Sequence, residues 1–148
     1  MITKPFSQKL HDACDPIARR SVMRWLKQVH CLDSIPNPNK YKVDLVAFKD
    51  LIPHSYVEVE MRLWREHWHY CPYPSIHVPL RKEKLFLNDL PTYMCVVNQY
   101  LKWAYWINVM EIITSPIIEV PNRAVNQGEF FYDVPTDKWR LFELDEPW

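Results

Sequence analysis

Two glutamates, Glu58 and Glu60, lie on one side of a stretch in which apolar and polar residues alternate. The period of two residues over 56–62 predicts a β-strand with two unlike faces. The apolar residues expected to face a core are Val57, Val59 and Met61. Carboxylates at i and i+2 of a strand lie roughly 6.5–7 Å apart. Such a pair belongs either to a solvated strand face or to a divalent-metal site, because hard cations bind carboxylate oxygens.

A third carboxylate, Asp44, lies in the middle of the preceding strand candidate, residues 41–48. This stretch is rich in β-branched and aromatic residues, and a charge inside it needs a partner or an ion. Residues 49–55, which include Pro53, can turn the chain back. Asp44 would then lie beside Glu58 and Glu60 on the neighbouring strand. Three converging carboxylates predict a Mg²⁺ site.

The spacing of these acids resembles the signature of the PD-(D/E)XK nuclease superfamily. Asp44 is followed by thirteen residues and then by Glu58-Val59-Glu60. Val43 stands where the superfamily has Pro, and Glu60 stands where it has Lys. Some type II restriction enzymes of the superfamily carry E-x-E at this place. The resemblance covers about residues 15–110.

The resemblance implies a metal-dependent DNA endonuclease that uses Mg²⁺ or Mn²⁺. In that assignment Asp44, Glu58 and the carbonyl of Val59 are the metal ligands. Glu60 orients the attacking water or acts as general base. A catalytic cation must then come from elsewhere, and the charge run 81–84 at the end of strand candidate 75–79, expected to neighbour the acidic strand in the sheet, can supply it. Lys82 is the first choice, Arg81 the second and Lys42 the third; the alternative is a solvated charge run.

A helix over residues 15–30 is expected, with Asp15 as N-cap and Pro16 at its first position. Its basic residues lie mostly off the apolar stripe, where they form either a solvated face or a phosphate-contacting face. The candidate nucleic-acid-binding residues of the chain are Arg20, Arg24, Lys42, Arg62 and Arg81.

A zinc site is the competing metal hypothesis. His67, His69 and Cys71 alternate, so on a strand they would share a face, and His54 or His77 could complete the ligand set. The spacing H-x-H-x-C is not usual for zinc, and packing or stacking by Trp68 and Tyr70 is the alternative. Such a site would make the chain a zinc-stabilised interaction module.

The composition predicts one globular domain. The chain has 148 residues, of which 48% are hydrophobic, and its formal net charge is zero, so no global field draws it to nucleic acid. No apolar run is long enough to span a membrane, no secretory signal is evident, and the four cysteines form no C-x-x-C pair. We therefore expect a soluble, cytoplasmic protein with free thiols.

The expected fold class is α+β: an N-terminal helix on a mixed sheet of about five to seven strands, with a restriction-endonuclease-like core. Residues 1–14 would form an arm, 15–110 the core, and 111–148 additional strands with an acidic end. Residues 33–40 read as a loop, and 99–110 as a turn and strand or as a helix. The other strand candidates are 92–98, 102–108, 117–120, 129–134 and 139–144.

The expected function is metal-dependent hydrolysis of nucleic acid, with DNA as the partner and a homodimer as the working form. The alternative is an inactive relative of the same fold that binds nucleic acid or a protein, since the motif Lys is missing.

Overall fold

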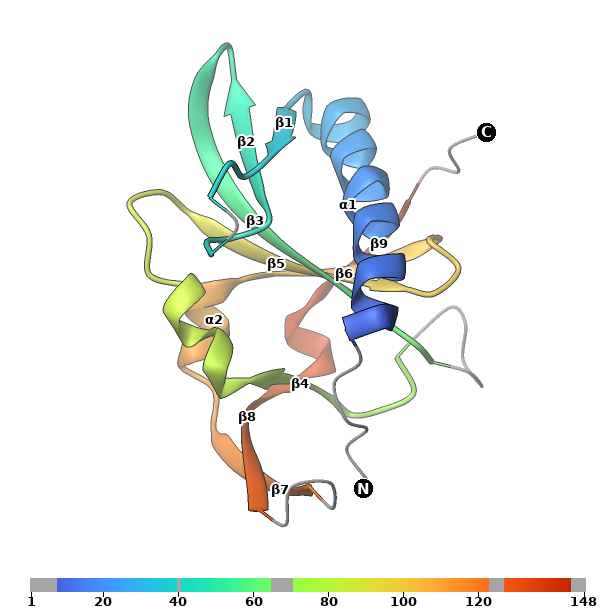
Figure 1. Cartoon of the computed structure of the whole chain (residues 1–148), viewed down its shortest axis with the longest axis vertical. Coiled ribbons are helices and arrows are strands. Elements are labelled where there is room, and N and C mark those ends of the chain that lie inside the picture. Colours follow the sequence, from blue (N-terminus) through green and yellow to red (C-terminus); the bar gives the residue numbers. More distant parts are fainter. Residues whose placement is uncertain (1–7, 40, 65–70, 123–126, 145–148) are drawn as a thin grey trace.

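A long helix and a six-stranded mixed sheet form the part of the fold that carries the acidic stretch (Figure 1). The computed structural model describes residues 8–39, 41–64, 71–122 and 127–144. The elements of this part are α1 (Gln8–His30), β1 (Asp33–Pro36), β2 (Leu45–Lys49), β3 (Ile52–Arg62), β5 (Thr92–Asn98), β6 (Trp103–Asn108) and β9 (Arg140–Glu143). The strand order is β1-β2-β3-β5-β6-β9, in which β3 and β5 run parallel and the other neighbours antiparallel.

A second sheet of three antiparallel strands, in the order β4-β8-β7, lies below the first in the view of Figure 1. Short helices connect the two sheets. The elements of this part are β4 (Ser75–Pro79), η1 (Leu80–Leu85), α2 (Val109–Ile113), β7 (Ile117–Asn122), β8 (Gln127–Pro135) and η2 (Thr136–Lys138). The architecture is therefore α+β, as the sequence predicts. No helix in the described part of the chain is long and apolar enough to cross a membrane.

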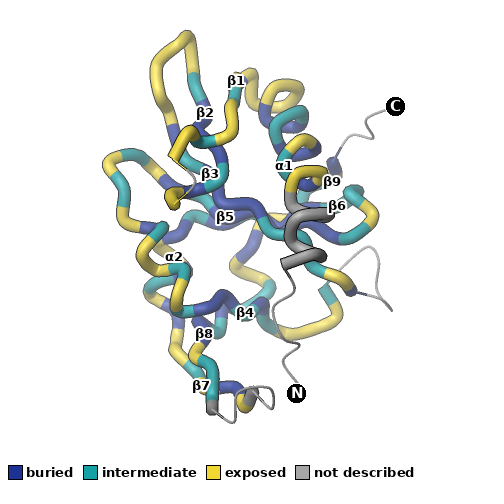
Figure 2. Tube along the Cα trace, in the orientation of Figure 1, coloured by how far each residue is buried: buried dark blue, intermediate teal, exposed yellow. Residues whose placement is uncertain are grey.

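The two faces of the six-stranded sheet are buried against different layers. On β5, Cys95 and Val97 join the core under α1, whereas Met94 and Val96 join the core that faces the second sheet and α2. A strand buried on both faces has little need of polar residues, which explains the continuous apolar run of β5. The buried residues accordingly follow the central strands in Figure 2.

Strand β3 follows the predicted alternation. Val57 and Val59 are buried in the core under α1. Glu58 and Glu60 pair in register with Met94 and Val96 of β5, so they lie on the face that the second sheet covers. That face is not a solvated one, because Glu58 is only 5% exposed.

Several predicted boundaries are wrong. Helix α1 begins at Gln8 and contains Pro16, so Asp15 is not its N-cap; the helix continues through a proline that removes one backbone hydrogen bond. Residues 33–36 form β1 instead of a loop. Strand β2 begins at Leu45, so Asp44 precedes it instead of lying in its middle. The helix considered for 99–110 is also wrong, since β6 occupies Trp103–Asn108.

The turn between β2 and β3 lies at Asp50 and Leu51, before Pro53. Both residues have positive φ, 51° and 68°, and β3 starts at Ile52 with Pro53 inside it. A pair of left-handed residues matches the twist of an antiparallel hairpin. A β-bulge between Ala47 and Phe48 then shifts the register by one residue, so that Leu45 faces Val57 and Asp44 lies next to Glu58.

Candidate functional site

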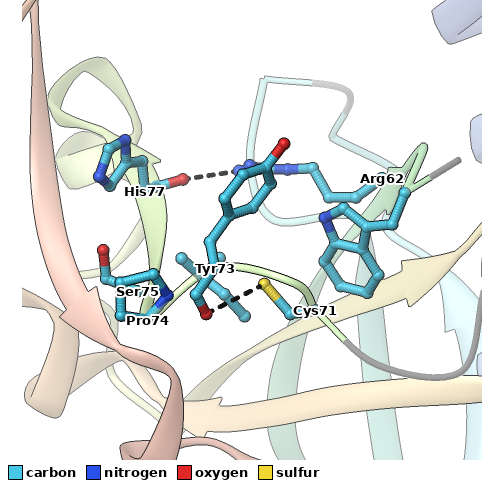
Figure 3. A pocket seen from close by; sticks show the side chains of 8 residues that line it. Arg62, Cys71, Tyr73, Pro74, Ser75 and His77 are labelled. Atoms are coloured by element: carbon cyan, nitrogen blue, oxygen red, sulfur yellow. Dashed lines mark hydrogen bonds between the residues drawn. The ribbon is translucent and has the colours of Figure 1, made fainter. Parts of the chain in front are cut away.

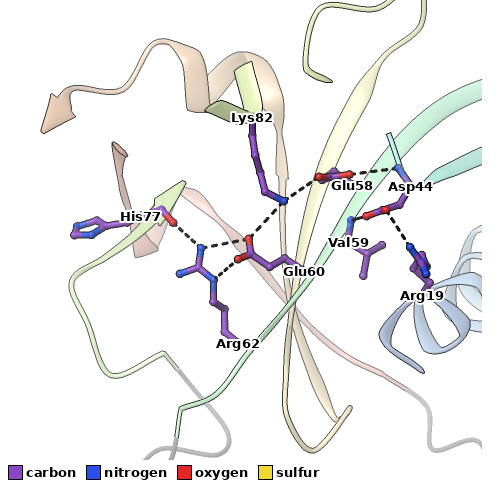
Figure 4. A network of polar contacts seen from close by, with 8 residues as sticks. All are labelled: Arg19, Asp44, Glu58, Val59, Glu60, Arg62, His77 and Lys82. Atoms are coloured by element: carbon purple, nitrogen blue, oxygen red, sulfur yellow. Dashed lines mark hydrogen bonds and ion pairs between the residues drawn. The ribbon is translucent and has the colours of Figure 1, made fainter. Parts of the chain in front are cut away.

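Three carboxylates and three cations form one polar network, to which α1, β3, η1 and the residue directly before β2 contribute (Figure 4). The carboxylates are Asp44, Glu58 and Glu60, and the cations are Arg19, Arg62 and Lys82. Here this set is called the acidic network. Asp44, directly before β2, lies beside Glu58 of the neighbouring strand β3, and Lys82 lies close to Glu58 and Glu60, as the sequence predicts.

Asp44 is held by α1 and by the backbone of β3. Its Oδ1 is 3.2 Å from Arg19 Nη1, and its Oδ2 accepts a hydrogen bond of 2.9 Å from the amide of Val59. Its own amide donates to Glu58 Oε1 at 3.3 Å. In a strand the amide and carbonyl of one residue point to the same edge, so the Val59 carbonyl also faces the Asp44 side of β3.

Glu58 lies between Asp44 and Lys82. Its Oε2 is 2.9 Å from Lys82 Nζ. Burial raises the pKa of Glu58 to about 7; the attraction of Lys82 opposes this rise and the neighbouring charge of Asp44 adds to it. Glu58 is therefore the member of the acidic network in which a negative charge is least favourable.

Lys82 reaches the acids from the second sheet. It lies in η1 directly after β4, and its Nζ is 4.0 Å from Glu60 Oε2 as well as 2.9 Å from Glu58. Burial disfavours its charge, but the attraction of Glu60 and then of Glu58 outweighs burial and raises the pKa of Lys82. Lys82 thus remains a cation that faces two carboxylates. The expectation that it would arrive from a neighbouring strand of the same sheet is wrong, since β4 belongs to the other sheet.

Glu60 forms an ion pair with Arg62. The guanidinium contacts both oxygens, with Nε 3.0 Å from Oε1 and Nη2 3.3 Å from Oε2, and Nη2 also donates to the carbonyl of His77 at 2.6 Å. Burial disfavours the charge of Glu60, but the attraction of Arg62 and then of Lys82 outweighs it and lowers the pKa of Glu60. A carboxylate with a lowered pKa is a weak base, so this geometry gives Glu60 little use as a general base.

Asp44 and Glu58 are the residues of the acidic network that could hold a hard divalent cation. Within the described ranges no group of three or more His, Cys, Asp or Glu side chains is arranged to hold a metal ion. Mg²⁺, however, is commonly held by one or two carboxylates together with water and substrate phosphate. Asp44 and Glu58 are such a pair, and a cation between them would relieve the repulsion that helps to raise the pKa of Glu58.

The candidate nucleic-acid-binding residues do not form one group. Arg20 and Lys42 are exposed, and Arg81 is exposed with its Nε 4.0 Å from Glu129. Arg24 is half-buried, and its Nη1 is buried with no hydrogen-bond partner among the described residues. Only Arg62 belongs to the acidic network, where it is engaged with Glu60.

The zinc hypothesis rests on His67 and His69, which lie outside the described residues. Of its other members, His77 Nε2 is 3.1 Å from Asp133 Oδ1, and His54 Nδ1 is 3.1 Å from Ser55 Oγ. Cys71 donates its amide hydrogen to the hydroxyl of Tyr105 at 2.9 Å. The predicted free thiols are present at Cys31, Cys71 and Cys95.

Sequence reasoning missed Arg19, which pairs with Asp44. It follows the buried Ala18 and precedes the buried Val22 by three positions, so it borders the stripe that α1 buries. That spacing could have identified it as the basic residue of the helix closest to the sheet.

Comparison of the chain with protein family models, curated proteins and solved structures finds no significant match.

Proposed function

We propose that the chain hydrolyses phosphodiester bonds of DNA in a metal-dependent reaction, as an endonuclease with a restriction-endonuclease-like core. The observation that carries this proposal is the convergence of Asp44, Glu58 and Lys82, which lie directly before β2, in β3 and in η1. Paired carboxylates could hold a metal ion, and a buried lysine beside them could bind the phosphate that the metal contacts.

Asp44 and Glu58 would hold the Mg²⁺ or Mn²⁺ ion, with the Val59 carbonyl as a further ligand. The bound cation would lower the pKa of a water molecule and neutralise charge on the scissile phosphate. Asp44 is the more accessible ligand, with 21% of its side chain exposed against 7% for Glu58. Substrate would therefore approach from the Asp44 side.

Lys82 would stabilise the negative charge that grows on the phosphate oxygens. Its Nζ is already fixed 2.9 Å from Glu58, so it would need little reorganisation when the phosphate binds. Glu60 and Arg62 would act as positioning residues: Glu60 keeps Lys82 charged, and Arg62 holds Glu60 in place. This role replaces the general-base role suggested by the sequence, because both Glu60 oxygens contact Arg62.

A second candidate function is a binding module of the same fold that lacks catalysis. It is favoured by the ion pairs that already neutralise each acid: Arg19 with Asp44, Lys82 with Glu58, and Arg62 with Glu60. Six charges that cancel within the chain can hold the layers together with no metal. Such a module would bind nucleic acid or a protein through the same face.

Cleavage of supercoiled plasmid, single-stranded DNA and single-stranded RNA with Mg²⁺, Mn²⁺ or EDTA separates the two functions. We expect nicking of DNA with either metal, none in EDTA, and a loss of at least about 100-fold in Asp44→Asn and Glu58→Gln. Asp33→Asn is the matched control, because Asp33 forms an exposed ion pair with Lys27 away from the acidic network. Wild-type protein that cleaves no substrate would contradict hydrolysis and support the binding module.

A further inference from the structure

A pocket of about 270 Å³ lies beside Arg62 (Figure 3). Arg62 lies at the end of the acidic network opposite to Asp44 (Figure 4). Its walls come from the end of β3 and from the stretch that leads into β4. The described lining residues are Arg62, Trp64, Cys71, Tyr73, Pro74, Ser75, Ile76 and His77. Pockets for drug-sized molecules measure about 300–1,000 Å³. This pocket therefore suits one small ring system instead of a segment of another chain.

The lining offers flat surfaces on which a ring can stack. Tyr73 is 53% exposed although it is a large aromatic residue, and Arg62 contributes a planar guanidinium. In Figure 3 both side chains border the pocket. Unpaired bases are commonly bound by stacking on aromatic rings or on guanidinium planes. The buried Trp64 lies at right angles to Tyr105, with ring centroids 5.6 Å apart, and forms a fixed wall.

Hydrogen bonds fix these walls in position. Arg62 donates to the carbonyl of His77 at 2.6 Å, and Thr136 Oγ1 donates to the carbonyl of Tyr73 at 2.8 Å. Ser75 Oγ donates to Asp133 Oδ1 at 2.5 Å. A pocket with fixed walls loses little conformational entropy when a ligand binds, which favours a specific occupant.

The pocket is connected to the acidic network through shared residues. Arg62 Nε is 3.0 Å from Glu60 Oε1. Lys82 Nζ is 4.0 Å from Glu60 Oε2 and 2.9 Å from Glu58 Oε2. A nucleic-acid strand with a phosphate at Glu58 and Lys82 would bring a neighbouring nucleotide to Arg62. Its base can enter the pocket only when it is unpaired and unstacked.

We propose that this pocket binds one unpaired nucleobase next to the phosphate held by the acidic network, so that the preferred substrate contains an unpaired nucleotide. The inference rests on the proposed function and deepens it. It assigns Tyr73 as the stacking residue for the base. Continuous duplex would fill the phosphate site without filling the pocket.

Fluorescence anisotropy with three labelled DNA probes tests this proposal. The probes are a duplex with one bulged thymidine, the same duplex with an abasic residue in the bulge, and the fully paired duplex. Titrations use wild type, Tyr73→Ala and Tyr100→Ala in Ca²⁺, and the probe is checked for cleavage after each titration. Tyr100 is the matched control, since it is 57% exposed and does not line the pocket.

We expect wild type to bind the bulged thymidine about 5- to 160-fold more tightly than the abasic bulge, the range for one base–aromatic stack. Tyr73→Ala should abolish this preference, and Tyr100→Ala should retain it. Equal affinity of wild type for the two bulged probes would overturn the proposal, even if the protein cleaves DNA. A preference for the base in a protein that never cleaves would support the pocket and overturn hydrolysis.

Discussion

The burial of Glu58 predicts that the stability of the metal-free protein depends on pH. The folded-state pKa of Glu58 is raised to about 7 from an ordinary value of 4.5. Between these two values the folded state retains a proton that the unfolded state releases. The stabilisation that comes from this proton is fully present below pH 4.5 and is lost as pH rises through 7. A Gln at position 58 mimics the protonated side chain and does not titrate.

The size of the effect follows from the shift. A pKa that rises from 4.5 to about 7 corresponds to about 3 kcal/mol, at 1.36 kcal/mol for each pH unit. Glu58 is only 5% exposed, so solvent screens this energy little. Wild type should therefore lose about 3 kcal/mol of unfolding free energy between pH 4.5 and pH 8 that Glu58→Gln retains, so the variant should become more stable relative to wild type by that amount.

Urea unfolding in EDTA at pH 4.5, 6, 7 and 8 measures this difference, because titrations common to both proteins cancel. Glu111→Gln, at an exposed position in α2, shows what the same substitution does away from the acidic network. A difference between Glu58→Gln and wild type that stays constant over this pH range would refute the reasoning. It would mean that the attraction of Lys82 fully offsets the cost of burying the charged Glu58, so that the pKa of Glu58 is not raised.

Three further predictions follow from the same geometry. The affinity for Mn²⁺, measured by calorimetry, should be about tenfold weaker at pH 6 than at pH 8, because binding must displace the Glu58 proton; a flat profile would contradict this. Arg19→Met should tighten Mn²⁺ binding up to about fivefold, since it removes the half-buried cation that competes at Asp44, and unchanged affinity would argue against Asp44 as a ligand. Leu45→Ala, at a fully buried position of β2, should lower the free energy of unfolding by about 2–5 kcal/mol in urea, and a loss below about 1 kcal/mol would contradict its place in the core.

The strand hairpin and its acids could be predicted because their signals are local. The alternation over β3 places Val57 and Val59 on one buried face, and the register that keeps Leu45 in the same core puts it opposite Val57. Asp44 is therefore close to Glu58 in the structure, as the sequence predicts. The chemistry of these residues remains a prediction.

The division into two sheets could not be read from the sequence. Strand β4 looks like any other short apolar strand, and no local pattern shows that it pairs with β8 instead of β3 or β5. For this reason Lys82 was expected from a neighbouring strand, although it comes from the opposite layer. The pocket beside Arg62 also depends on how the two sheets pack, so its residues carry no common sequence signal.

The start of α1 and strand β1 were missed for a different reason. Asp15-Pro16 is a strong signal for a helix start, yet the helix begins seven residues earlier, at Gln8, and continues through Pro16. Residues 33–36 contain Pro36 and have weak strand propensity. They form β1 because the edge of β2 is available for pairing, with Asp33 opposite Phe48 and Pro36 opposite Leu45. Tertiary pairing outweighs local propensity in β1.

A double-mutant cycle on the rate of Mg²⁺-dependent DNA cleavage tests the central claim most directly. Asp44→Asn and Lys82→Met are measured singly and together, with wild type as reference. If both residues serve one hydrolytic site, each single substitution should remove at least about 100-fold of the rate, and the double variant should be little slower than either. Losses that multiply, or wild-type protein that cleaves no DNA, would contradict the account.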